Sequence, residues 1–146
     1  MHKSDIEILL ENADALKLSL NWLKHSIKLC SKIKDFENLT INEYDHLESL
    51  TARFARVTDI LFNKVFRSIV LIETGSSKTL LDALFFLSKV NIIENPERAR
   101  FLKEIRNDIV HDYLQEDLID LFKKEMIYKQ NSIPGKQKTG EYYFKK

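Results

Sequence analysis

The chain has 146 residues, with 23 basic and 22 acidic side chains, and 44% of its residues are hydrophobic. This is the length of one domain, and the composition is that of a globular protein rather than a disordered one. Three glycines and two prolines leave few turn residues, which argues against a β-sandwich or barrel. The single cysteine, Cys30, excludes an internal disulfide and a cysteine-based zinc site. The net charge of +1 indicates no particular partner.

The N-terminal residues lack the layout of a signal peptide, and no apolar run approaches the length that spans a membrane. We therefore expect a cytoplasmic protein with no membrane partner. His2, His25 and His46 lack the spacing of metal ligands, so we expect no metal and no other cofactor.

The first two predicted helices are long. Apolar residues at alternating steps of three and four predict a helix over residues 5–33, with Ser4 as its N-cap. Its apolar stripe is Ile6, Leu9, Ala13, Leu16, Leu20, Leu23, Ile27 and Cys30. Thr40 and Glu43 fit a capping box that opens a second helix, over residues 40–73. The apolar stripe of that helix is Tyr44, Leu47, Thr51, Phe54, Thr58, Leu61, Val65, Ile69 and Ile72.

Shorter helices follow. Gly75 suits a left-handed C-terminal cap for the second helix, and residues 79–90 form a third. Asn95 before Pro96 is a strong start signal for a helix that ends near His111, and a further helix spans residues 114–128. The sequence predicts an all-α, up-and-down bundle of four to five helices over residues 1–130. Residues 131–146 form a basic tail that is loosely held or partner-dependent.

Arg106 stands out because it faces the apolar side of its helix. On a wheel of about 100° per residue it shares that side with a set of hydrophobic residues: Ala99, Leu102, Ile105, Ile109 and Val110. An arginine that faces a core must find a carboxylate, or lie in an interface or a wet cleft. The simplest alternative to a functional role is a salt-bridged or snorkelling arginine.

A histidine and a tyrosine follow Arg106 closely, at His111 and Tyr113. RNA cleavage needs a group that titrates near neutrality to move the 2′-hydroxyl or leaving-group proton, and histidine suits that task. The transition state gains negative charge on the phosphate, which a guanidinium can bind with two hydrogen bonds. This pair of side chains requires no metal.

The pattern of Arg106, four residues, His111, one residue and Tyr113 resembles the signature of the HEPN superfamily, in the form found in HepT-type toxins of HEPN/MNT toxin–antitoxin pairs. Residues 50–61 also resemble the long second helix of such proteins, so the resemblance covers most of the chain up to about residue 128. It implies a HEPN-like fold and a metal-independent ribonuclease that acts as a homodimer, with transfer RNA among the substrate types.

The resemblance also implies roles for individual residues. Arg106 and His111 would be the catalytic pair, and Asn107 would help to order the site. Tyr113 would be the residue onto which a partner nucleotidyltransferase antitoxin transfers AMP from ATP, which blocks the RNA site. On residue type alone, His111 could instead be a surface or capping histidine, and Tyr113 a packing residue.

Helix geometry poses a difficulty for this catalytic pair. Five residues on a continuous helix place Arg106 and His111 about 140° apart. Either the helix bends or ends near His111, or the site is composite and a second protomer completes it.

A basic stripe on the second predicted helix is independent of the resemblance. Arg53, Arg56, Lys64 and Arg67 fall within about 80° of one another on a straight α-helix. With Asp59 as the only acid among them, four cations and one acid give +3. Such a stripe suits an RNA backbone, although a solvated charged face is the simpler interpretation.

Two other functions remain open. The first is a non-catalytic helical module that partners a nucleotidyltransferase and presents its substrate, with Arg106 and His111 in the interface. The second is a structural dimerisation bundle. Cleavage that depends on His111 distinguishes the ribonuclease from both.

Overall fold

The structure, a computed structural model, describes residues 3–111, and within this range every regular element is a helix. The elements are α1 (Asp5–Cys30), α2 (Ile41–Ile60), the π-helix η1 (Leu61–Phe66), α3 (Arg67–Thr74), α4 (Leu80–Lys89) and α5 (Pro96–His111). The prediction of an all-α bundle is confirmed. The predicted helix over 114–128, the boundary near residue 130 and the basic tail lie outside the described residues.

The helices begin at the capping residues that the sequence indicates. Ser4, Thr79 and Asn95 cap α1, α4 and α5, and each accepts a backbone N–H of the first turn, at 3.1, 3.2 and 2.9 Å respectively. Thr40 and Glu43 form the predicted capping box, with reciprocal hydrogen bonds of 3.1 and 2.9 Å. These side chains satisfy N–H groups that have no partner within the helix, which fixes where each helix starts.

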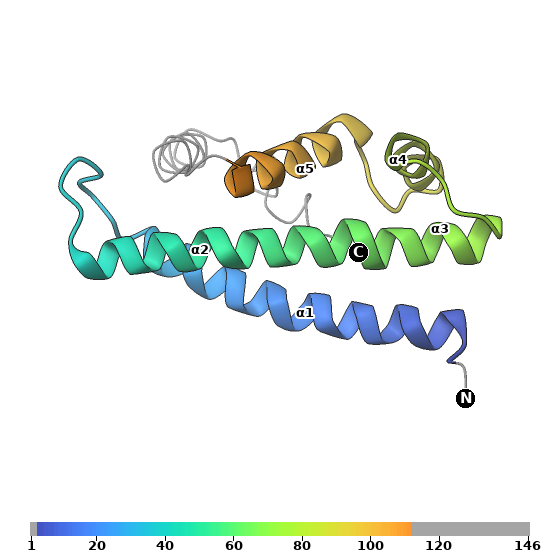
Figure 1. The fold of residues 1–146 in the computed structure, drawn as a ribbon, viewed down its shortest axis with the longest axis horizontal. Coiled ribbons are helices and arrows are strands. Elements are labelled where there is room, and N and C mark those ends of the chain that lie inside the picture. The colour runs from blue at the N-terminus through green and yellow to red at the C-terminus, as the bar shows by residue number, and fades with distance from the viewer. Residues whose placement is uncertain (1–2, 112–146) are drawn as a thin grey trace.

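The bundle is arranged around one long rod. α2, η1 and α3 follow one another without a break, α1 packs along one side of the rod, and α4 and α5 lie on the other (Figure 1). Gly75 ends the rod with φ 74°, the left-handed conformation predicted for it. α5 packs against both α2 and α4, so it closes the second layer over the rod.

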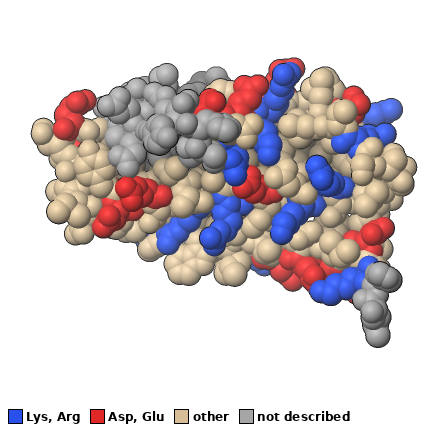
Figure 2. All heavy atoms as spheres, in the orientation of Figure 1, with Lys and Arg blue, Asp and Glu red and all other residues tan. Residues whose placement is uncertain are grey.

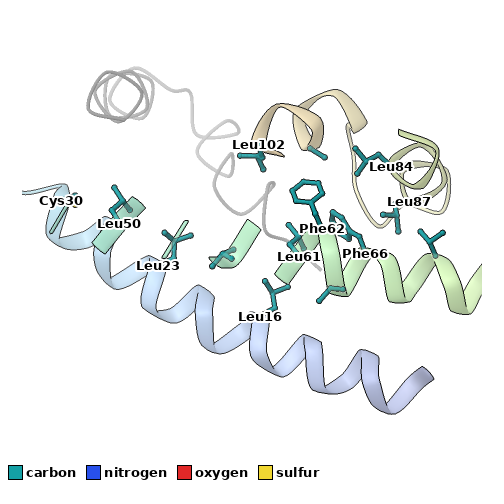
Figure 3. Packing of buried hydrophobic residues seen from close by; sticks show 14 of the residues in the cluster. Leu16, Leu23, Cys30, Leu50, Leu61, Phe62, Phe66, Leu84, Leu87 and Leu102 are labelled. Carbon is teal, nitrogen blue, oxygen red and sulfur yellow. The ribbon is translucent and has the colours of Figure 1, made fainter. Parts of the chain in front are cut away.

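The middle of the rod is a π-helix, where the sequence predicted an uninterrupted α-helix. A π-turn bonds residue i to i+5 and holds one more residue than an α-turn. Within this segment two adjacent pairs of residues are buried, Leu61 with Phe62 and Val65 with Phe66. Phe62 and Phe66 project toward α4 and α5 (Figure 3), while η1 also contacts α1, so this segment packs against both layers.

The predicted apolar stripe of α1 is buried or partly buried from Leu16 onward, but it is more exposed near its start. Leu16, Leu23 and Cys30 are buried, whereas Ile6 is 61% exposed and Ala13 is also exposed. Figure 1 shows α1 separating from the rod toward its N-terminus, so its start packs less closely than its middle, although α1 still contacts α3 and Leu9 is partly buried. The helix also ends at Cys30, before the predicted Ile33.

Within residues 3–111, none of the helices combines the length and apolar composition that a membrane crossing requires.

Candidate functional site

Arg106 on α5 forms a two-point ion pair with Asp59 on α2. Arg106 Nε donates to Asp59 Oδ1 at 2.6 Å, and Nη2 donates to Oδ2 at 2.7 Å. The two side chains are 21% and 36% exposed, so the pair lies at the edge of the α2–α5 contact with one side open to solvent. Of the outcomes expected for an arginine on this face, the structure gives the carboxylate partner.

The pairing leaves part of the guanidinium available. Its hydrogen bond with Asp59 raises the pKa of Arg106 further above its usual value, against the opposing effect of burial, so the group stays charged. Nε and Nη2 bind Asp59, whereas Nη1 makes no hydrogen bond with any residue between 3 and 111. A planar guanidinium held on one edge by a carboxylate can bind a second acceptor, such as a phosphate oxygen, on another edge.

The other residues of the motif lie toward the end of α5. Asn107 is exposed next to Arg106. The backbone is helical throughout Pro96–His111, so positions 106 and 111 are about 140° apart around one uninterrupted helix. The side chain of His111 and all of Tyr113 lie outside the described part of the chain.

The four basic residues of the predicted stripe fall into two groups. Arg53 is turned to α1, where Nη1 donates to Ser26 Oγ at 2.6 Å and the guanidinium lies 5.1 Å from the centre of the Trp22 ring. Arg56, Lys64 and Arg67 are exposed, and none forms an ion pair with a carboxylate of residues 3–111.

The π-turn also changes the angles within this stripe. The value of about 80° assumed α-helical geometry throughout, but the extra residue in η1 rotates later positions by roughly one residue, or ~100°. Arg67 follows η1, whereas Arg53 and Arg56 precede it. The stripe is therefore not straight, and its C-terminal part turns around the rod.

Sequence patterns do not reveal two features of the site. In the sequence Asp59 is simply an acid among cations, whereas in the structure it lies where α2 meets α5 and binds Arg106. The second feature is Lys103, one turn before Arg106. Its ammonium lies 3.5 Å from Asn63 Oδ1 and 6.0 Å from the centre of the Phe62 ring, so α5 adds a cation next to the rod.

Basic side chains gather across the middle of one face, over the region where the rod meets α5, with an acidic group among them (Figure 2). Among residues 3–111, no group of three or more histidine, cysteine or acidic side chains is placed to hold a metal ion. The arrangement offers fixed positive charge and hydrogen-bond donors, which suit a phosphate-bearing partner.

Comparisons with protein-family models, with curated proteins and with solved structures gave no match for this chain.

Proposed function

We propose that this protein is a metal-independent ribonuclease of the HEPN type and acts as the toxin of a toxin–antitoxin pair. The observation that carries the proposal is the two-point contact of Asp59 with Arg106, which orients a permanently charged guanidinium at the edge of a basic surface and leaves Nη1 without a hydrogen bond to residues 3–111. A pre-oriented cation of this kind stabilises the charge that develops on a phosphate during cleavage.

The chemistry divides between two side chains. Arg106 binds non-bridging oxygens of the scissile phosphate. The His111 imidazole accepts the 2′-hydroxyl proton as that oxygen attacks phosphorus, or donates a proton to the departing 5′-oxygen. Asn107, exposed next to Arg106, helps to order the bound phosphate, and Arg56, Lys64 and Arg67 hold the flanking RNA backbone.

A homodimer reconciles these roles with the helix geometry. Because α5 is helical from Pro96 to His111, one copy of the helix directs positions 106 and 111 about 140° apart. Because α5 is uninterrupted between positions 106 and 111, we favour the composite arrangement, in which a second copy of the chain completes the site.

Control of the ribonuclease rests on Tyr113, two residues beyond His111. In this proposal a cognate MNT-type nucleotidyltransferase antitoxin transfers AMP from ATP to the Tyr113 hydroxyl, with release of pyrophosphate and the hydroxyl proton. The added AMP then blocks the site that the RNA would enter.

The alternative is a non-catalytic module that binds a nucleotidyltransferase and presents its substrate. One observation favours it: Asp59 already neutralises Arg106, so the arginine is electrostatically satisfied without a phosphate. The two proposals differ in whether the purified chain cuts RNA.

The decisive experiment is cleavage of total cellular RNA by the full chain in EDTA. His111→Ala and Arg106→Ala are compared with the matched controls His25→Ala, on α1, and Arg100→Ala, an exposed arginine of α5. We expect discrete fragments from the wild type and both controls, and none from the two site variants, with folding verified by circular dichroism.

Intact RNA in every lane would contradict the ribonuclease proposal, provided that mass spectrometry finds Tyr113 free of AMP. A binding module would then be the better interpretation, and the motif variants should lose the nucleotidyltransferase complex instead.

A further inference from the structure

A pocket of about 90 Å³ opens between the rod, the segment before α4, and α5. Its floor is apolar: Phe62 and Phe66 of η1 pack edge to face at 5.3 Å, and Leu84 of α4 faces them (Figure 3). Arg106 and Asp59 are not among the residues that line it. The pocket is therefore distinct from the Arg106–Asp59 site proposed for RNA cleavage, although Arg67, proposed above to hold the flanking RNA backbone, lies at its rim.

The rim of this pocket is positively charged. Arg67 of α3, Lys78 before α4 and Lys103 of α5 all line it, and no acidic residue of the described chain does so. None of the three forms an ion pair with a carboxylate within residues 3–111. Three cations from three different segments thus converge on one opening without an acidic partner in the described structure, which favours an anionic ligand.

The position of Lys103 links the charged rim to the apolar floor. Its ammonium lies 6.0 Å from the centre of the Phe62 ring and 3.5 Å from Asn63 Oδ1, which also lines the pocket. These contacts hold the charge above the aromatic floor instead of leaving it extended into solvent. A ligand that fits both surfaces needs a negative group and an apolar body a few atoms apart.

The N-terminus of α4 adds a smaller positive charge to the rim of the pocket. Lys78 and Leu80 line the pocket on either side of the N-cap Thr79, so the positive end of this ten-residue helix lies at the rim. Asp82, in the first turn of α4, is not among the lining residues.

We propose that this pocket binds a small phosphate monoester whose apolar part is a single ring or a short branched alkyl chain. A phosphate monoester carries up to two negative charges, which matches three cations better than the single charge of a carboxylate. The volume is smaller than the ~150 Å³ cavity that holds a benzene ring. Because the pocket is open to solvent, the ring enters partway and leaves its phosphate at the rim.

The test uses the full chain labelled with ¹⁵N and phenyl phosphate as the probe. Titration followed by NMR should shift the side-chain amide of Asn63 and the backbone amides of Ser77 and Lys78. Inorganic phosphate, benzyl alcohol and benzoate each supply only part of the recognised chemistry. Inorganic phosphate lacks the ring, benzyl alcohol lacks the charge, and benzoate carries a single charge. We expect each of them to bind at least about tenfold more weakly than phenyl phosphate.

Charge reversal at the rim supplies the matched comparison. Lys103→Glu should weaken phenyl phosphate binding about tenfold or more, and the milder Lys103→Gln should weaken it less. Lys89→Glu makes the same charge change at the far end of α4, away from the pocket, and should leave the affinity unchanged.

Three results would overturn the proposal: no shifts at the pocket residues, equal loss of affinity in Lys103→Glu and Lys89→Glu, or equal affinity for benzoate. This experiment contains no RNA and measures no cleavage. Its failure would leave the proposed ribonuclease untouched, and inactivity on RNA would leave the pocket untouched.

Discussion

Arg106 and Asp59 are separated by 47 residues of sequence and joined by two hydrogen bonds of 2.6 and 2.7 Å. The pair ties α5 to α2 and so fixes the rotation of the helix that carries Arg106, Asn107 and position 111. A change at Asp59 therefore alters the candidate site from a different helix, although Asp59 lies far outside the motif.

Substitutions of Arg106 and Asp59 should have non-additive effects on the free energy of unfolding. We expect Arg106→Ala and Asp59→Ala each to destabilise the fold, with a coupling of about 1 kcal/mol in a double-mutant cycle, because the bidentate geometry is good but the pair is partly exposed. The exposed pair of Arg100 and Glu104, 3.5 Å apart on one helix, should couple by only about 0.3 kcal/mol. Urea unfolding measures both cycles, and equal couplings would contradict a special role for the α2–α5 pair.

Arg53 and Arg56 should behave in opposite ways, although they lie three residues apart. Arg53→Ala removes the contacts with Ser26 and Trp22 and should cost about 1.5 kcal/mol of stability. Arg56→Ala, at an exposed position, should cost less than about 0.5 kcal/mol.

The same two variants should also differ in the salt dependence of RNA binding. This is measured by fluorescence anisotropy over a range of salt concentrations, in a His111→Ala background. Arg56→Ala should reduce the slope of log K against log salt by about 0.7, the value for one lost single-strand phosphate contact. Arg53→Ala should leave the slope unchanged. The reverse result would show that Arg53 can leave α1 to bind RNA.

Stability should fall at high pH because of Cys30. The thiol is fully buried, with Sγ donating to the His46 carbonyl oxygen at 3.4 Å, and burial raises its pKa from 9.0 to about 11. Above pH 9 the unfolded chain loses this proton while the folded protein keeps it. The free energy of unfolding therefore falls by up to about 1.4 kcal/mol per pH unit between pH 9 and 11.

The control for this prediction is Cys30→Ala, which lacks the titrating group. Urea unfolding of both proteins is measured between pH 7 and 10.5, and the free energy of unfolding is plotted against pH. The two plots should be parallel up to about pH 9 and converge above it. Curves that stay parallel to the end would mean that the thiol ionises equally easily in the folded protein.

Gly75 should tolerate asparagine better than alanine. A Cβ at this position would meet no atom within 4 Å, so its φ of 74° is the only obstacle to a side chain. Gly75→Ala should cost about 1 kcal/mol in thermal or urea unfolding, and Gly75→Asn clearly less, because asparagine adopts the left-handed conformation more readily. Equal costs for the two variants would locate the penalty in packing instead of backbone conformation.

Local chemistry made much of the fold predictable. Hydroxyl and amide caps such as Thr40 and Asn95, and the glycine at position 75, act within a few residues, so their effects can be read directly from the sequence. The π-turn could not be predicted in this way. The pattern around Phe62 and Phe66 fits a 3.6-residue repeat well enough, and only packing against helices on both sides selects the wider turn.

The candidate site is predictable only in part. An arginine on an apolar helix face needs a partner, which makes Arg106 recognisable in the sequence, but the sequence does not show that the partner is Asp59. Such pairings depend on how α2 and α5 lie against each other. For the same reason the sequence does not show that Lys78 and Lys103 lie beside Arg67, because the three residues belong to separate segments.

The π-turn in the rod has a consequence for comparing this chain with others. It holds one residue more than an α-turn while the rod continues unbroken from Ile41 to Thr74. A relative with a wholly α-helical rod would therefore carry one residue fewer between Asp59 and Gly75, with both ends of the rod in the same places. Sequence alignments normally avoid gaps inside helices. Here, however, the correct alignment would place a single-residue gap within the rod.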